Sequence, residues 1–339
     1  MKIAILSFAH THAATYARLL AARDDIELVA SDPDGAETVS FTSDVGPRGR
    51  ALADQLGVSY LDNYDDVFAW GPDAVIVTAE NARHRALVER AAAAGADILC
   101  EKPLATTLDD GRAMHSAVRD AGVRLMVAYP VRFSSSFADA RARVSAGQLG
   151  TVLGVRGTNN GKIPLADRAW FTDQGLAGGG SLVDHVVHCA DLLDALLGES
   201  AATVRAVSNR ILHADRGVAV ETGGLVTVTY PSGVIATIDC SWSVPDSAPT
   251  WGGLTLQIVG TKGTMTIAPF AQHVDGYDAN GPVFTPVGDD LDGAMLEEFL
   301  CAVRDRRQPQ PDADVGMRTL AIVDAARRSA ETGQPVDVT

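Results

Sequence analysis

The first third of the chain alternates short apolar runs with segments of helical periodicity, and this alternation constrains the fold more than any other feature. The runs are nearly continuous in Val, Ile, Leu and Ala, as expected for strands that helices cover on both faces. We therefore predict an α/β Rossmann domain with a parallel, doubly wound sheet over residues 1–128. The expected strands are residues 2–7, 26–31, 73–79, 96–101 and 123–129, and the expected helices are residues 14–23, 86–95 and 106–121.

From residue 129 onwards the pattern is different. The apolar runs are longer, alternate with polar residues, are rich in Thr and Val, and are separated by Gly, Pro and Ser. These features are typical of a mostly antiparallel sheet with one solvated face. We expect a second, α+β domain over residues 129–339, built on a large, mostly antiparallel open sheet. Its expected helices are an amphipathic stretch at 137–150, a helix after the glycine run 178–180, and helices over 294–306 and 315–332.

Composition and charge argue against several classes of protein. The 339-residue chain is 46% hydrophobic and 21% charged, and no apolar run approaches the roughly 20 residues of a membrane helix. A net charge of −15 without a local Lys/Arg cluster argues against a nucleic-acid partner. The opening segment lacks the features of a secretory signal, and the cysteines show no CxxC spacing. We therefore expect a cytoplasmic protein with free thiols and no membrane partner.

The turn after the first strand is where a Rossmann domain carries GxGxxG, because glycine lets the cofactor diphosphate approach the backbone at a helix N-terminus. Here Ser7, Ala9 and His12 occupy the three glycine positions. Small residues at the first two positions still permit a close approach, and Ser7 or Thr11 can donate to phosphate. We expect the whole turn to contact the cofactor, that is Ser7, Phe8, Ala9, His10, Thr11 and His12.

The pair His10 and His12 has two interpretations. An HxH pair occurs among metal ligands, but the sequence offers no third ligand at a suitable spacing. Polar residues at a helix start are the simpler interpretation, and we expect no metal.

Asp32 follows the second expected strand, 25 residues after Ser7. An acidic residue at this place accepts a hydrogen bond from the adenosine ribose 2′-OH, which favours NAD. The alternative is a turn-forming aspartate before Pro33. Arg48 and Arg50 lie downstream and are compatible with a 2′-phosphate, so NADP is the second candidate.

Three segments, VIVTAENARHRALVERAAAAGADILCEKPLATT, VAYPVRF and GGGSLVDHVVHCADLL, carry a family resemblance. In this order they resemble the glucose-fructose oxidoreductase and inositol dehydrogenase family, called Gfo/Idh/MocA. The resemblance covers nearly the whole chain. It implies a Rossmann domain followed by an α/β domain on an open sheet, NAD or NADP as cofactor, and sugars, cyclitols or their relatives as substrates.

The resemblance also implies cofactor contacts after the fourth and fifth strands. Asn81 and His84 match the family's NxxH, although Glu80 stands where proline is usual. Glu101, Lys102 and Pro103 match EKP, a turn that in the family lies beside the nicotinamide ribose with the lysine facing substrate, and the resemblance implies a cis Lys102–Pro103 bond. With Thr78 and Ala79 of the preceding strand end and Arg132 after the sixth strand, these complete the expected cofactor set.

Asp184 and His188 match the acidic residue and the histidine of the family's DxGxH, with Val186 in place of glycine. Alcohol oxidation requires a base of near-neutral pKa, and an imidazole suits that task. We therefore expect His188 to be the general acid/base, Asp184 to orient it or the substrate, and Lys102 to stabilise the oxyanion. The other expected substrate contacts are Tyr129, Arg132, Asn159, Trp170 and His185, where Trp170 is equally compatible with sugar stacking and core packing.

The sequence thus predicts an NAD(P)-dependent oxidoreductase that acts on a CH-OH group of a polyhydroxylated small molecule. We expect a homodimer or homotetramer formed through the open sheet face. Two alternatives remain: a non-catalytic sensor of cofactor or sugar on the same fold, favoured by the altered 7–12 turn, and an enzyme that keeps its nicotinamide bound between turnovers.

Overall fold

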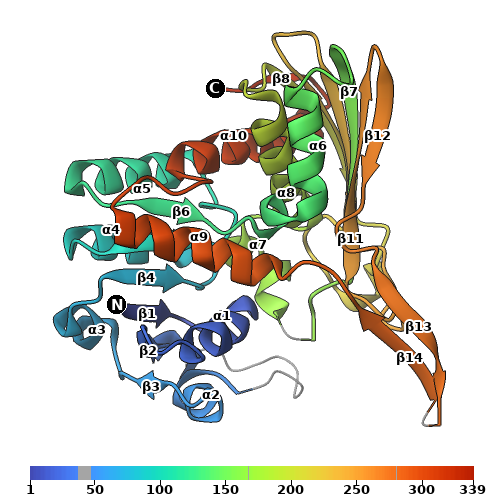
Figure 1. Cartoon of the computed structure of the whole chain (residues 1–339). Coiled ribbons are helices and arrows are strands. Elements are labelled where there is room, and N and C mark those ends of the chain that lie inside the picture. Colours follow the sequence, from blue (N-terminus) through green and yellow to red (C-terminus); the bar gives the residue numbers. More distant parts are fainter. Residues whose placement is uncertain (37–46, 167, 280) are drawn as a thin grey trace. The chain divides into compact units, whose positions relative to one another are not determined.

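The computed structural model describes residues 1–36, 47–166, 168–279 and 281–339, without the side chain of Pro282. The chain divides into two compact units, and each is described by itself (Figure 1). Unit 1 comprises Met1–Tyr129, Pro164–Gly178 and Asp292–Leu320, and unit 2 comprises Pro130–Ile163, Gly179–Leu291 and Ala321–Thr339.

Unit 1 is built on a six-stranded parallel sheet in the order β3-β2-β1-β4-β5-β6. Strand β1 pairs with β2 on one side and β4 on the other, so the strand order reverses beside it. In open α/β sheets, ligands bind at the carboxyl ends of the strands at such a reversal. The strands are β1 (Lys2–Leu6), β2 (Glu27–Ser31), β3 (Ser59–Tyr60), β4 (Ala74–Val77), β5 (Asp97–Cys100) and β6 (Leu125–Val127).

Helices cover this sheet, and β1, β4, β5 and β6 are accordingly almost completely buried. Figure 1 shows α9 crossing in front of the parallel strands. The helices of unit 1 are α1 (His12–Ala21), α2 (Gly49–Leu56), α3 (Tyr64–Trp70), α4 (His84–Ala93), α5 (Leu108–Ala121), α7 (Gln174–Ala177) and α9 (Leu291–Asp305), and α10 (Ala313–Thr332) begins in it. Short 3-10 turns lie at η1 (Pro33–Ala36), η2 (Asn81–Arg83) and η4 (Ala169–Thr172).

Unit 2 is built on a seven-stranded sheet in the order β12-β11-β7-β10-β9-β8-β15. Only β10 and β7 pair in parallel among these strands, and the other neighbours are antiparallel. The strands are β7 (Val152–Gly161), β8 (Thr203–Asn209), β9 (Gly223–Thr229), β10 (Ile235–Ser241), β11 (Gly252–Gly260), β12 (Gly263–Ile267) and β15 (Val336–Asp337). A separate hairpin consists of β13 (His273–Asp278) and β14 (Gly281–Pro286).

Helix α8 (Ser181–Leu197) packs on one face of this sheet against β7, β9 and β10, with α6 (Ser135–Ser145) beside it (Figure 1). Strand β10 therefore alternates buried and exposed residues, such as Ile238 at 0% and Ile235 at 51% exposure. On the face away from α8, three large apolar side chains from adjacent strands are at least half exposed, namely Val207, Leu225 and Ile235. In the part of the chain that the structure describes, no helix covers them.

The predicted fold class, a parallel Rossmann sheet followed by a mostly antiparallel sheet, is confirmed. Within it, the expected helix 106–121 begins at Leu108, because Thr107 is its N-cap and accepts a hydrogen bond from the Asp110 amide. The cysteines are free, as expected, and three of the four are buried. Among the described helices, none combines the length and the apolar character needed to cross a membrane.

Candidate functional site

The β1–α1 turn keeps a glycine-like backbone at its first position. Ser7 has a φ of +74°, in the left-handed region that glycine normally fills in this turn. Its Oγ donates to Asp32 at 3.1 Å and accepts from the Ala9 amide at 3.1 Å. Short polar side chains tolerate this conformation better than larger ones because they can hydrogen-bond locally. The turn therefore has the shape of a dinucleotide-binding turn without its glycines.

Amides in this turn are already hydrogen-bonded inside the protein. The His10 amide donates to the backbone carbonyl of Thr78 at 2.9 Å. The Ala9 amide donates to Ser7 Oγ, and the His12 amide donates to His10 Nδ1 at 3.2 Å. The last two amides are held by side chains, which can rotate away. A phosphate at this turn would have to displace them.

The N-terminus of α1 has no capping side chain and no acidic residue of its own. Its N-cap residue, Thr11, is exposed and forms no side-chain capping hydrogen bond, and the first turn contains no acidic residue. The partial positive charge at this helix end is thus not neutralised by the helix itself. A cofactor diphosphate would meet a favourable field here.

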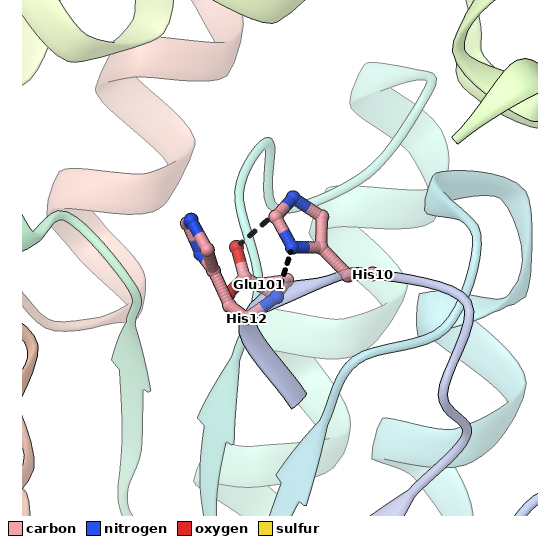
Figure 2. Close-up of side chains that lie close together, drawn as sticks. All are labelled: His10, His12 and Glu101. Atoms are coloured by element: carbon pink, nitrogen blue, oxygen red, sulfur yellow. Dashed lines mark hydrogen bonds and ion pairs between the residues drawn. The ribbon is translucent and has the colours of Figure 1, made fainter. Parts of the chain in front are cut away.

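Two histidines of the turn converge on Glu101, which follows β5 (Figure 2). His12 Nδ1 lies 3.0 Å from Glu101 Oε1, and His10 Nε2 lies 3.9 Å from Oε2. Tyr16, one helical turn after His12, donates its hydroxyl to Oε1 at 2.8 Å. Glu101 and His10 are each 1% exposed, whereas His12 is partly accessible. The group is a buried carboxylate with imidazoles on two sides.

Burial and charge act in opposite directions on this group. Burial by itself raises the pKa of Glu101, but the imidazoles of His10 and His12 and the Lys102 ammonium outweigh it and hold the pKa well below its ordinary value. Burial holds the pKa of His10 well below its ordinary value, against the attraction of Glu101. Glu101 is therefore the ionised member of the group near pH 7.

Lys102 lies in the turn after β5, and the Lys102–Pro103 peptide bond is cis, as the resemblance implied. The side chain is buried at 4% exposure, with Nζ 5.6 Å from the ring centroid of Phe171. The backbone amide of Lys102 donates to Glu101 Oε2 at 3.2 Å. Most lysines are exposed to solvent, so a buried ammonium beside an aromatic ring is unusual.

His84 holds this turn in place. Its ring is completely buried, with Nδ1 3.1 Å from the Pro103 carbonyl and Nε2 3.1 Å from the Ala79 carbonyl. The side-chain amide of Asn81, three residues before His84 in η2, donates to the Ala177 carbonyl at 2.9 Å. The Thr78 hydroxyl donates to the Ser7 carbonyl at 2.7 Å. These residues shape the carboxyl end of the sheet. Their expected contact with a cofactor stays a prediction.

Asp32 is saturated by hydrogen bonds. Its carboxylate accepts from Ser7 Oγ, from two nitrogens of Arg48 at 2.8 and 3.1 Å, and from the Gly49 amide at 3.1 Å. Arg48 also reaches the buried Glu80 at 3.3 Å. A ribose hydroxyl would therefore compete with Arg48 for Asp32. Arg48 is one of the two arginines whose position in the sequence is compatible with a 2′-phosphate. NAD and NADP therefore both remain candidates.

In unit 2, Asp184 and His188 both lie on α8, four residues apart on one side of the helix, and both are half-buried. Asp184 Oδ2 lies 3.1 Å from Nε2 of His185 and accepts a hydrogen bond from the Trp242 indole at 3.2 Å. His185 Nδ1 lies 2.9 Å from the Asn159 carbonyl. Both nitrogens of His185 thus face acceptor oxygens, one on α8 and one on β7.

Asn159 and the glycine run position α8. Asn159 is fully buried on β7, and its side-chain amide donates to the His185 carbonyl at 3.2 Å. At Gly180 a Cβ would lie 2.0 Å from the Glu221 carbonyl, so no larger residue fits. The Glu221 carboxylate accepts from the amides of Gly180 and Leu182 and caps the helix from outside it. Close packing within unit 2 is thus sufficient to explain Gly180.

Three expected contacts are engaged elsewhere. Arg132 pairs with the buried Asp191 at 2.5 Å, and burial raises the pKa of that carboxyl to about 6 although the arginine works in the opposite direction. The Tyr129 hydroxyl lies 2.9 Å from Thr319 Oγ1. The Trp170 indole donates to the Ala9 carbonyl at 2.9 Å. Their roles toward substrate or cofactor stay predictions.

Sequence reasoning missed three members of these clusters: Tyr16, Glu80 and Trp242. Tyr16 was detectable, because it stands four residues after His12 and so on the same face of a helix. Glu80 was noted only as a departure from the family pattern. Trp242 left no signal, because a tryptophan in a strand region is ordinarily core.

Two family models match the chain. One is described as an oxidoreductase family with an NAD-binding Rossmann fold and matches residues 17–129. The other is described as the GFO/IDH/MocA C-terminal domain and matches residues 137–266.

Several enzymes are similar over nearly their whole length. The 1,5-anhydro-D-fructose reductase of Ensifer adhaerens is 31% identical over 317 residues, which cover 90% of this chain and 92% of that enzyme. The D-xylose 1-dehydrogenase (NADP(+)) 2 of Haloferax volcanii is 28% identical, with coverages of 89% and 92%. The scyllo-inositol 2-dehydrogenase (NAD(+)) of Bacillus subtilis strain 168 is 27% identical, with coverages of 92% and 91%.

Solved structures share the fold. GenD2 from gentamicin A biosynthesis, crystallised with NAD, superimposes with a TM-score of 0.86 at 24% identity, covering 100% of this chain and 96% of that one. The aldose-aldose oxidoreductase of Caulobacter crescentus, complexed with glycerol, gives a TM-score of 0.78 at 26% identity, with 99% of each chain covered.

Proposed function

Because the chain belongs to the Gfo/Idh/MocA oxidoreductase family, we propose that it is an NAD(P)-dependent dehydrogenase of a sugar, sugar derivative or cyclitol. The reaction would transfer a hydride between the nicotinamide and a secondary hydroxyl or carbonyl carbon. The observation that carries the proposal is the buried Lys102 in its cis-proline turn after β5, in a chain that also places Asp184 and His188 on α8. We expect the protein in the cytoplasm.

The residues of unit 1 fit a dinucleotide. The strand order reverses beside β1, Ser7 adopts the left-handed backbone of the dinucleotide-binding turn, and α1 begins without a cap or an acid. We propose that residues 7–12 hold the diphosphate, that Asp32 or Arg48 meets the adenosine ribose, and that the turn of Glu101 and Lys102 lies beside the nicotinamide ribose. The nicotinamide, when bound, supplies or accepts the hydride.

We assign proton transfer to His188. An imidazole accepts the hydroxyl proton during oxidation and returns it during reduction. Asp184, held by the Trp242 indole, would bind a substrate hydroxyl or orient the imidazole. Lys102 would place its positive charge at the oxygen that becomes alkoxide-like, and removing one such donor typically costs ~10²–10³ in rate.

The test has two stages. Fluorescence titration with NADH and NADPH comes first, and polyols and sugars are then screened by nicotinamide absorbance. We expect Lys102→Ala and His188→Ala each to lower kcat by at least ~10² while nucleotide affinity stays largely intact. Lys262→Ala, on the exposed turn between β11 and β12, is the matched control and should change neither quantity.

The outcomes separate the alternatives. Absence of binding of both nucleotides would refute the cofactor assignment. Unchanged turnover in both variants would refute the catalytic one. The second candidate function, a non-catalytic sensor of cofactor or sugar, is favoured by the amides of Ala9, His10 and His12, which are bonded inside the protein rather than offered to a phosphate. It predicts a folded protein without turnover on any polyol or sugar.

We also propose association as a homodimer or homotetramer through the open face of the unit 2 sheet. Its exposed apolar side chains come from three adjacent strands, β8, β9 and β10, and apolar patches of this kind mark interaction sites. Leu225→Glu places a charge in this patch and should yield monomers in sedimentation velocity, whereas a wild-type protein that is already monomeric would contradict the proposal.

A further inference from the structure

Three side chains that bind metals in many proteins meet at the start of α1. His10 and His12 come from the β1–α1 turn and Glu101 from the end of β5, and one ligand atom of each lies within 4.8 Å of the others (Figure 2). We propose that His10, His12 and Glu101 bind a divalent transition-metal ion, with Zn²⁺ as the best match. The three residues belong to the proposed cofactor-binding set, but none of them is among the proposed catalytic residues Lys102, Asp184 and His188.

The spacing suits a small ion. Zinc binds nitrogen and oxygen at about 2.0–2.2 Å, which places tetrahedral ligand atoms roughly 3.4 Å apart. His12 Nδ1 lies 3.0 Å from Oε1 of the carboxylate, His10 Nε2 lies 3.9 Å from Oε2, and one ligand atom of each residue lies within 4.8 Å of the others. Small side-chain rotations would bring all three ligand atoms onto one ion.

His10 gives an independent indication of a ligand. It is 1% exposed, and its Nε2 has no hydrogen-bond partner among the residues that the structure describes. The 3.9 Å to Glu101 is too long for a hydrogen bond. Buried polar atoms in native proteins are rarely left without a partner. A metal ion between Nε2 and the carboxylate would satisfy both.

Metal binding at His10 would break one hydrogen bond, the one from the His12 amide to His10 Nδ1. His10 Nδ1 now accepts from the His12 amide at 3.2 Å, so the proton of the neutral ring is on Nε2. Binding at Nε2 moves this proton to Nδ1 and exchanges a long hydrogen bond for a metal–nitrogen bond. It also releases the His12 amide at the start of α1, where it can donate to an anionic ligand.

The surroundings of the carboxylate resemble those of a metal ligand. Tyr16 donates to Glu101 Oε1 and the Lys102 amide donates to Oε2, so the carboxylate is held in orientation by neighbours. Such outer-shell hydrogen bonds orient metal-binding groups and typically affect affinity 10–100-fold. The mixed imidazole and carboxylate donors favour zinc, cobalt, nickel or iron over calcium or magnesium.

The experiment measures metal binding alone, on the full chain treated with chelator and without nucleotide. Co²⁺ is titrated while the visible absorption is recorded, and Zn²⁺ is titrated by calorimetry. We expect one ion per chain and a rise in thermal unfolding temperature with Zn²⁺, because an ion that binds only the folded state stabilises it. Since no nucleotide or substrate is present, failure of this test leaves the proposed function intact.

Three variants locate the ion. His12→Ala, at a partly accessible position, should weaken Co²⁺ binding more than ~100-fold, and Tyr16→Phe about tenfold. His115→Ala removes a partly exposed histidine on α5 and should leave binding unchanged. Circular dichroism establishes that each variant is folded. Equal Co²⁺ affinity in the wild type and His12→Ala, or no binding by the folded wild type, would overturn the proposal.

Discussion

Two helices of unit 1 begin at the carboxyl end of the same sheet in opposite ways. Helix α5 is self-sufficient: Thr107 accepts from the Asp110 amide, and two aspartates in the first turn match the positive end of the helix. Helix α1 has neither a capping side chain at Thr11 nor an acid in its first turn. The difference teaches that α5 is stabilised by its own first turn, whereas the start of α1 is contacted by a group distant in sequence, Glu101, and is where we propose that the diphosphate binds.

The start of α1 lies beside a cluster of titratable groups, His10, His12 and Glu101, and α5 has no such cluster at its start among the described residues. His10 and Glu101 beside α1 are buried and lie close to the partly exposed His12, while His115 on α5 is partly exposed and pairs with Asp314. A helix end that relies on buried titratable groups should respond to pH, and one that awaits an anion should respond to added charge. The following predictions test both points.

The largest expected effect is on stability in acid. Burial holds the pKa of His10 below the ordinary value of 6.5, so the unfolded chain takes up a proton near pH 6.5 and the folded chain does not. This stability is fully present above the unfolded pKa and is lost as pH falls below it. We expect the free energy of unfolding to fall by up to about 1.4 kcal/mol per pH unit for this group between about pH 6.5 and pH 5, measured by urea denaturation of chelator-treated protein.

His84 is buried with a lowered pKa and adds to the same fall, so the variant comparison isolates His10. His10→Gln should reduce the slope by about one group's contribution, and His115→Gln on α5 should leave it unchanged. Identical slopes in the wild type and His10→Gln would show that His10 does not titrate differently in the two states.

A smaller effect is expected from a charge at the start of α1. Thr11→Asp should stabilise the helix by about 0.3–1 kcal/mol, because a carboxylate complements the dipole. The same charge would repel a diphosphate, and we expect NADH affinity to fall at least about tenfold, or ~1.4 kcal/mol, in a fluorescence titration. Unchanged NADH affinity would show that the diphosphate does not bind at the start of α1.

The smallest effect is the matched control on α5. Thr107→Ala removes a capping hydrogen bond and should destabilise the protein by about 1 kcal/mol without changing NADH affinity. A loss of affinity here would show that the two helix ends are not functionally distinct.

Much of the fold was predictable because it rests on local pattern. Continuous apolar runs separated by helical periods predicted the parallel sheet of unit 1, and alternating Thr- and Val-rich runs predicted the open sheet of unit 2. The cis bond at Lys102 and the helix from Ser181 followed from motifs with a defined order. Such signals are short-range, so they survive in a single sequence.

The contacts of the candidate residues were harder to predict from the sequence. Asp32 was interpretable as a ribose ligand or a turn residue, but its pairing with Arg48 and the link to Glu80 depend on three separate segments. In unit 2 the position of His185 between Asp184 and the Asn159 carbonyl depends on the packing of α8 on β7. Pairings of this kind have no sequence period.

The sequence by itself determined the two sheets, the turn after β1 with its two histidines, and the turn after β5 with Glu101 and Lys102. Only the tertiary structure decided that these turns meet. Parallel pairing of β1 with β4 and of β4 with β5 brings the segments after β1 and β5 to one edge of the sheet, where His12 contacts Glu101, 89 residues away in the sequence. The missing third ligand of the HxH pair was therefore in the sequence, but no spacing along the chain could identify it.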